Sequence, residues 1–128
     1  MTTYGQWCPV AMAAEVLTER WTPLIVRELL CGSTRFNDLR RGVPLMSPSL
    51  LSKRLETLRR VGVVARVGGE YRLTPAGEEL RPIIELMGVW GRRWAMGDVE
   101  AKHHDAGLLM WDIHRNIVAD RLLAATSR

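Results

Sequence analysis

The stretch that decides the fold is residues 35–60, RFNDLRRGVPLMSPSLLSKRLETLRR. A short helix is predicted at its start, and Gly42 and Pro44 end that helix. Ser47 is a favourable N-cap and Pro48 suits a first helical turn, so a second, longer helix is expected from there. Two short helices joined by a turn are the layout of a helix-turn-helix that reads DNA.

The second of these helices has one apolar and one polar face. Leu51, Leu55 and Leu58 recur at the three- and four-residue spacing of a single buried stripe. The opposite face carries Pro48, Ser49, Ser52, Lys53 and Glu56. Small polar and basic side chains on an exposed helix face favour contact with DNA.

Positive charge is concentrated in the same stretch. Residues 35–60 hold seven basic and two acidic side chains, a local charge of +5, whereas the whole chain carries +4. The remainder of the chain is therefore nearly neutral. This distribution favours a polyanionic partner, although net charge alone supports only non-specific affinity.

Two helices are predicted before this stretch, over residues 9–18 and 23–31. Pro9 suits the start of the first, and Thr22 is the expected N-cap of the second. The predicted buried stripe of the second helix consists of Leu24, Ile25, Leu29 and Leu30. These two upstream helices are thus expected to support the helix-turn-helix.

A tight β-hairpin is predicted after it. Two β-rich runs, residues 63–67 and 70–74, are separated by only two glycines. A two-residue loop fixes the register, so that Val64 lies opposite Leu73 and Arg66 opposite Tyr71.

Further helices are expected towards the end of the chain. One opens at Thr74, another runs on from Arg81, and a last one covers residues 106–125. The apolar stripe of the helix from Arg81 includes Ile83, Met87, Trp90 and Trp94. The predicted fold class is mainly α with a small β-hairpin, a winged helix-turn-helix, with a domain over residues 1–97 and a helical extension over 98–128.

Size and composition fit an ordinary globular protein. The 128 residues are 47% hydrophobic and 25% charged, and no apolar run approaches the roughly 18 residues that span a bilayer. The first residues lack the basic and apolar regions of a signal peptide. Two cysteines make neither a disulfide framework nor a zinc set. A cytoplasmic protein with no membrane partner is expected.

Three segments carry a resemblance to a known family. They are CPVAMAAEVLTERWTPLIVRELLCGSTRFNDLRRGVP from residue 8, SPSLLSKRLETLRRVGVV from residue 47, and YRLTPAGEEL from residue 71. Together they resemble the HxlR family of bacterial winged-helix regulators, relatives of the MarR type. The match covers about residues 8–94.

The resemblance implies a homodimer that binds double-stranded DNA. The N-terminal helix and the helix after the wing would pack across a two-fold axis, with interface residues Val10, Ala14, Met87, Trp90 and Trp94. The recognition helix would enter the major groove with its first residues nearest the bases. Base-edge candidates are then Pro48, Ser49, Ser52 and Lys53, while Ser47 and Arg54 would lie nearer the phosphates.

Three further arginines are expected at the DNA: Arg35, Arg40 and Arg66. The hairpin loop is shorter than is usual in the family, which weakens the case for minor-groove contact by the wing. Arg66 and Arg72 are the only basic groups in the hairpin.

Cys8 matches a position that senses electrophiles or oxidants in some proteins of the HxlR type, so it is the candidate redox sensor. A helix N-terminus lowers the pKa of a thiol and enlarges its thiolate fraction. The alternative is that Cys8 is a small apolar packing residue. Cys31 is expected to pack near the end of its helix.

No catalytic motif, metal site or cofactor is predicted. His103, His104 and Asp105 are consecutive and so would not all face one ion on a helix, and His114 does not change this. The expected function is a transcription regulator, more a repressor than an activator, on a pseudo-palindromic operator. One alternative is a sensor of a small molecule or lipid held by the Trp-rich C-terminal half. Another is an interaction module whose basic face meets an acidic protein.

Overall fold

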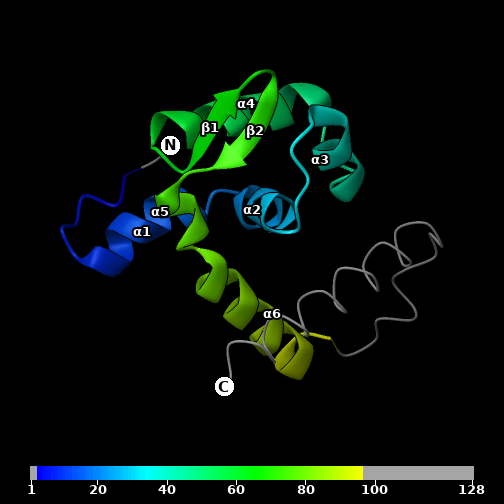
Figure 1. Ribbon diagram of the computed structural model, residues 1–128. Helices are drawn as coiled ribbons and strands as arrows, with labels where there is room; N and C mark the ends of the chain where they lie inside the picture. Colours follow the sequence, from blue (N-terminus) through cyan, green and yellow to red (C-terminus); the bar gives the residue numbers. More distant parts are fainter. Residues whose placement is uncertain (1–2, 97–128) are drawn as a thin grey trace. The chain divides into compact units, whose positions relative to one another are not determined.

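The structure is a computed structural model that describes residues 3–96 (Figure 1). Its elements follow the order α1 (Pro9–Leu17), α2 (Thr22–Leu30), α3 (Phe36–Gly42), α4 (Pro48–Arg60), β1 (Val64–Val67), β2 (Glu70–Leu73), α5 (Pro75–Glu78) and α6 (Arg81–Trp94). The predicted last helix and the histidine cluster lie outside the described residues. None of the helices within residues 3–96 is long and apolar enough to cross a membrane.

The chain divides into two compact units after Leu80. The first unit holds α1 to α5 and the hairpin, and the second begins with α6. The predicted boundary at residue 97 adjoins the undescribed part of the chain. The helix-turn-helix, its upstream support and the hairpin therefore form one unit.

Side-chain caps explain where α4 and α5 begin. Ser47 caps α4, because its Oγ accepts a hydrogen bond of 3.2 Å from the Leu50 N–H. Thr74 caps α5 in the same way through the Gly77 N–H. The predicted helix α2 is present, but its predicted N-cap was wrong: Thr22 is the first helical residue, and Trp21 occupies the N-cap position with a left-handed backbone, φ 80°.

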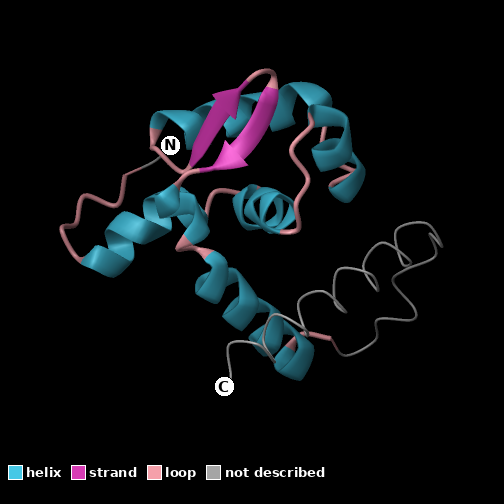
Figure 2. Ribbon diagram, viewed as in Figure 1, coloured by secondary structure: helices cyan, strands magenta, loops and turns pink. Residues whose placement is uncertain are grey.

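The hairpin has the predicted register. Val64 lies opposite Leu73 and Arg66 opposite Tyr71 in the antiparallel pair (Figure 2). Gly68 and Gly69 have φ values of 58° and 81°. Both central loop residues thus adopt the positive φ of the hairpin turn whose twist matches the strands, and glycine adopts it without strain.

The core lies between α2, α3, α4 and the hairpin. Its buried apolar members are Ile25, Leu29, Leu39, Val43, Met46, Leu51, Leu55, Leu58, Val63, Val64 and Tyr71. The three predicted leucines of α4 are all at most 2% exposed. The prediction for Leu24 was wrong, since its side chain is 38% exposed and Val26 is buried instead.

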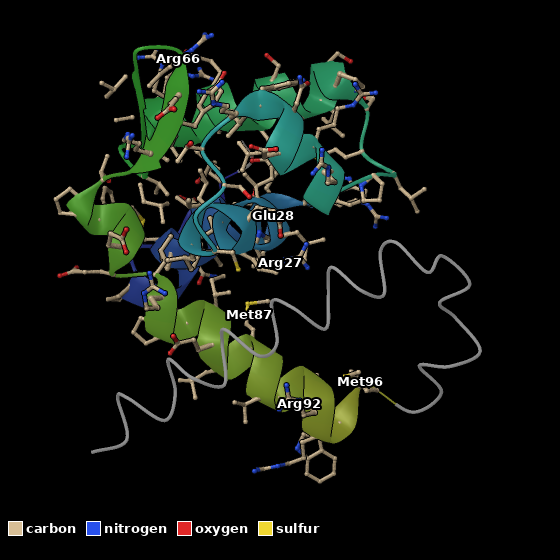
Figure 3. All side chains as sticks on the ribbon, turned by 45° about the vertical axis from the view of Figure 1, so that its right-hand side comes forward. Arg27, Glu28, Arg66, Met87, Arg92 and Met96 are labelled. Carbon is tan, nitrogen blue, oxygen red and sulfur yellow. The ribbon has the colours of Figure 1, made fainter. Side chains whose placement is uncertain are left out.

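A pair formed by a buried carboxylate and its arginine connects α2 to the end of α3. Glu28 is fully buried and forms an ion pair of 2.9 Å with Arg27 Nε. The two residues lie side by side on α2 in Figure 3. Arg27 Nη2 also donates a 3.0 Å hydrogen bond to the Gly42 carbonyl oxygen. A Cβ at Gly42 would collide with the Glu28 carboxylate, so a larger residue at this position would have to displace the buried carboxylate from its place.

Candidate nucleic-acid interface

The predicted base-facing residues lie on one accessible face at the start of α4. Pro48, Ser49, Ser52 and Lys53 are all exposed, as is the cap residue Ser47. The hydroxyl oxygens of Ser47 and Ser49 lie 3.4 Å apart. Burial of the leucine stripe on the opposite side holds this polar face towards solvent.

Uncompensated positive charge lies beside this face. Within residues 3–96, Arg40 and Arg41 at the end of α3 and Lys53 on α4 form no ion pair, and all three are exposed. Exposed cations without an intramolecular partner are free to pair with phosphate oxygens. The two halves of the helix-turn-helix therefore both contribute to a basic surface.

Arg59 differs from these cations because Glu56 neutralises it. Its Nε and Nη2 donate to the two Glu56 carboxylate oxygens at 2.9 and 2.7 Å. The hydrogen bond from Arg59 lowers the pKa of the Glu56 carboxyl. Glu56 is thus ionised at neutral pH and compensates the charge at the far end of α4.

Arg54 points into the protein. Its Nη1 lies 2.8 Å from Glu19 Oε1, and its Nε donates a 3.1 Å hydrogen bond to the Arg20 carbonyl oxygen. Only 15% of the Arg54 side chain is exposed. We expected Arg54 to lie near the phosphates, but in the structure its guanidinium binds to the junction between α1 and α2.

The wing offers little free charge. Arg66, labelled in Figure 3, is exposed and holds its guanidinium 5.2 Å from the centre of the Tyr71 ring. Glu70 pairs with Arg72 at 2.7 Å and more loosely with Arg35 at 3.8 Å. Among the predicted DNA-contacting arginines outside α4, Arg35 is thus paired with a carboxylate, whereas Arg40 and Arg66 form no ion pair within residues 3–96.

Cys8 occupies the N-cap position of α1 and is exposed. The backbone N–H groups of Ala11 and Val10 lower the pKa of its thiol, because they favour the thiolate. Packing in a core is therefore not the role of Cys8 in this unit. The prediction for Cys31 was wrong, because Cys31 is also exposed.

The predicted dimer residues are apolar side chains on two helices, and all but Ala14 are exposed. On α1, Val10 is 76% exposed and Ala14 is half-buried. On α6, Met87 is 51%, Trp90 63% and Trp94 71% exposed. Contiguous exposed apolar side chains are typical of surfaces that bind a partner.

Comparison with known proteins identifies the family. The model of the HxlR-like helix-turn-helix matches residues 16–99. The chain belongs to the HxlR-like helix-turn-helix family. YvaP of Bacillus subtilis, an uncharacterized HTH-type transcriptional regulator, is 38% identical over 98 residues, which cover 70% of this chain and 91% of YvaP.

Two solved structures are similar to this HxlR-like protein. PA1607, described as a transcription factor, superposes with a TM-score of 0.66 at 32% identity, over 74% of this chain and 70% of PA1607. Quinone-bound YodB of B. subtilis superposes with a TM-score of 0.61 at 31% identity, over 68% of this chain and 99% of YodB. The mainly helical winged helix-turn-helix fold is confirmed, and the protein belongs to a family of DNA-binding transcription regulators.

Proposed function

We propose that the protein is a homodimeric repressor that occupies a pseudo-palindromic operator. The observation that carries this proposal is the exposed face of Ser49, Ser52 and Lys53, which the buried leucines of α4 hold outward. The exposed α1 and α6 faces support a dimer. Two copies of α4 about 34 to 36 Å apart would enter successive major grooves.

The chemistry of the face suits direct reading of base edges. Lysine donates to guanine O6 and N7, and a serine hydroxyl donates or accepts. Arg40 and Arg41 would bind phosphate oxygens, which fix the orientation of the protein but carry no sequence information. Repression follows from occupancy, because a protein bound at a promoter excludes other proteins from it.

We expect Lys53→Ala to change the ranking of operator variants. Loss of a base contact costs about 1 to 3 kcal/mol at the base pair concerned. Arg40→Ala, the matched control, should weaken binding to all sequences alike because Arg40 is assigned to phosphate. The affinities of both variants for a panel of single-base operator mutants distinguish a base contact from a phosphate contact. An unchanged ranking with Lys53→Ala would reduce Lys53 to a backbone contact.

We also propose that an electrophile at Cys8 releases the DNA. The exposed thiol with its lowered pKa supports this, as does the quinone bound in the similar YodB. The Cys8 thiolate would add to a quinone ring carbon, forming an S–C bond, and the ring would take up a proton as it becomes a hydroquinone. The added group would disturb α1 and with it the proposed dimer.

Quinone treatment should therefore release operator DNA from the wild type but not from Cys8→Ser. Cys31→Ser is the control, because Cys31 is also exposed and its replacement should leave the response unchanged. Alkylation of Cys8 should reach half its maximal rate at a lower pH than alkylation of an unperturbed thiol, because backbone N–H groups lower the Cys8 pKa. Release that persists in Cys8→Ser would show that the signal acts elsewhere.

A further inference from the structure

We propose that Arg54 is a positioning residue, which sets the orientation of α4 for DNA reading through its pair with Glu19. The inference rests on the proposed function of α4 as the recognition helix. It gives Arg54 a different role from the phosphate contact that its place on a basic helix suggests.

Two separate acceptors hold the guanidinium. One is the Glu19 carboxylate at 2.8 Å, and the other is the backbone carbonyl of Arg20 at 3.1 Å. Both side chains are largely shielded, with 15% of Arg54 and 22% of Glu19 exposed. A planar guanidinium bonded in two directions has a fixed orientation, which a flexible ammonium group would not provide.

The acceptors belong to a rigid junction between α1 and α2. The Thr22 N–H donates to the Glu19 carbonyl oxygen at 3.0 Å, which closes a tight turn. Trp21 has φ 80°, a conformation that a bulky residue adopts only where its surroundings enforce it. Its ring packs against the core, with the Arg20 guanidinium 5.6 Å from the ring centre. The junction is therefore a firm anchor for Arg54.

The position of Arg54 on α4 explains what this anchor controls. Arg54 directly follows Ser52 and Lys53, so it belongs to the helical turn that presents them. Burial of Leu51 and Leu55 determines which side of α4 faces the core, but the hydrophobic effect is non-directional and does not by itself set the exact rotation of the helix about its axis. The directional Arg54 bonds would restrict this rotation further and so refine the placement of the exposed side chains at the groove.

The decisive variant is Glu19→Ala, because the two roles of Arg54 predict opposite signs. The probes are a duplex that the wild type selects from a random library and a scrambled duplex of equal length. A positioning role predicts affinity about tenfold weaker for the selected duplex, as for one lost base contact, and no loss for the scrambled one. A phosphate contact predicts tighter binding to both duplexes, because a negative charge is removed and Arg54 is released.

Glu56→Ala is the matched control. It also removes one carboxylate and releases one arginine, Arg59, but leaves the α1–α2 junction intact. Its ratio of selected to scrambled affinity should equal that of the wild type. An equal fall of the ratio in Glu56→Ala and Glu19→Ala would overturn the inference, because it would attribute the fall to charge alone.

Arg54→Lys decides the question if Glu19→Ala does not fold, as judged by circular dichroism. It keeps the charge but loses the two-directional bonding, so the selected duplex should again bind about tenfold more weakly, with an unchanged salt slope. If folded Glu19→Ala or folded Arg54→Lys keeps the wild-type ratio of selected to scrambled affinity, the inference about Arg54 is overturned but the proposed function is not. Absence of discrimination in the wild type itself would instead refute the proposed function.

Discussion

Raising the salt concentration from about 50 to 200 mM should weaken operator binding about 10³- to 10⁵-fold. Such a fall corresponds to roughly 6 to 10 phosphate contacts, each of which releases condensed counterions from the duplex. Arg40 and Arg41 are exposed without an ion pair within the described residues, and Arg66 is exposed on the hairpin. In the proposed dimer, two copies of these three side chains would supply contacts at the lower end of that range.

The slope of log affinity against log salt concentration measures this directly. Arg40→Ala should make the slope shallower, because each protomer loses one phosphate contact. Arg59→Ala is a useful comparison, since Glu56 already compensates Arg59 and the slope should change less. An affinity that does not respond to salt would contradict a role for the basic surface in DNA binding.

Replacing both Trp90 and Trp94 by alanine should dissociate the proposed dimer. Each side chain is mostly exposed on α6, and truncating a tryptophan that is packed in an interior costs about 3 to 5 kcal/mol. Operator affinity should fall with the dimer, because a single protomer binds only one half-site. Sedimentation velocity of the double variant, at the concentration where the wild type is dimeric, tests this.

The control for the dimer experiment is Leu45→Ala. Leu45 is 90% exposed but lies in the turn between α3 and α4, and so belongs to neither of the proposed interface helices. It should sediment as the wild type does. A double tryptophan variant that remains dimeric would place the interface on another surface.

Much of the fold was predictable because local chemistry determines it. The caps at Ser47 and Thr74, the leucine spacing of α4 and the two-glycine hairpin loop each act within a few residues along the chain. The exposed polar face of α4 follows from the same periodicity, since a buried stripe on one side leaves the other side open.

Contacts between distant residues were not predictable in this way. Arg54 and the Arg20 carbonyl are 34 residues apart, and nothing in the local pattern distinguishes an arginine that points inward from one that faces solvent. The burial of Glu28 could not be predicted for the same reason. It becomes evident only from the three-dimensional structure, where Glu28 pairs with Arg27 and lies against Gly42. The left-handed Trp21 likewise depends on tertiary packing.

The ratio of affinities for the selected duplex and a scrambled duplex, at one salt concentration, tests DNA reading by α4 most directly. Specific regulators bind their sites typically 10³ to 10⁷ times more tightly than other DNA, and a ratio in this range is predicted here. The selected duplex should contain two inverted half-sites with centres about 10 base pairs apart. Equal affinity for both duplexes would contradict sequence-specific recognition and favour a basic surface that binds polyanions without discrimination.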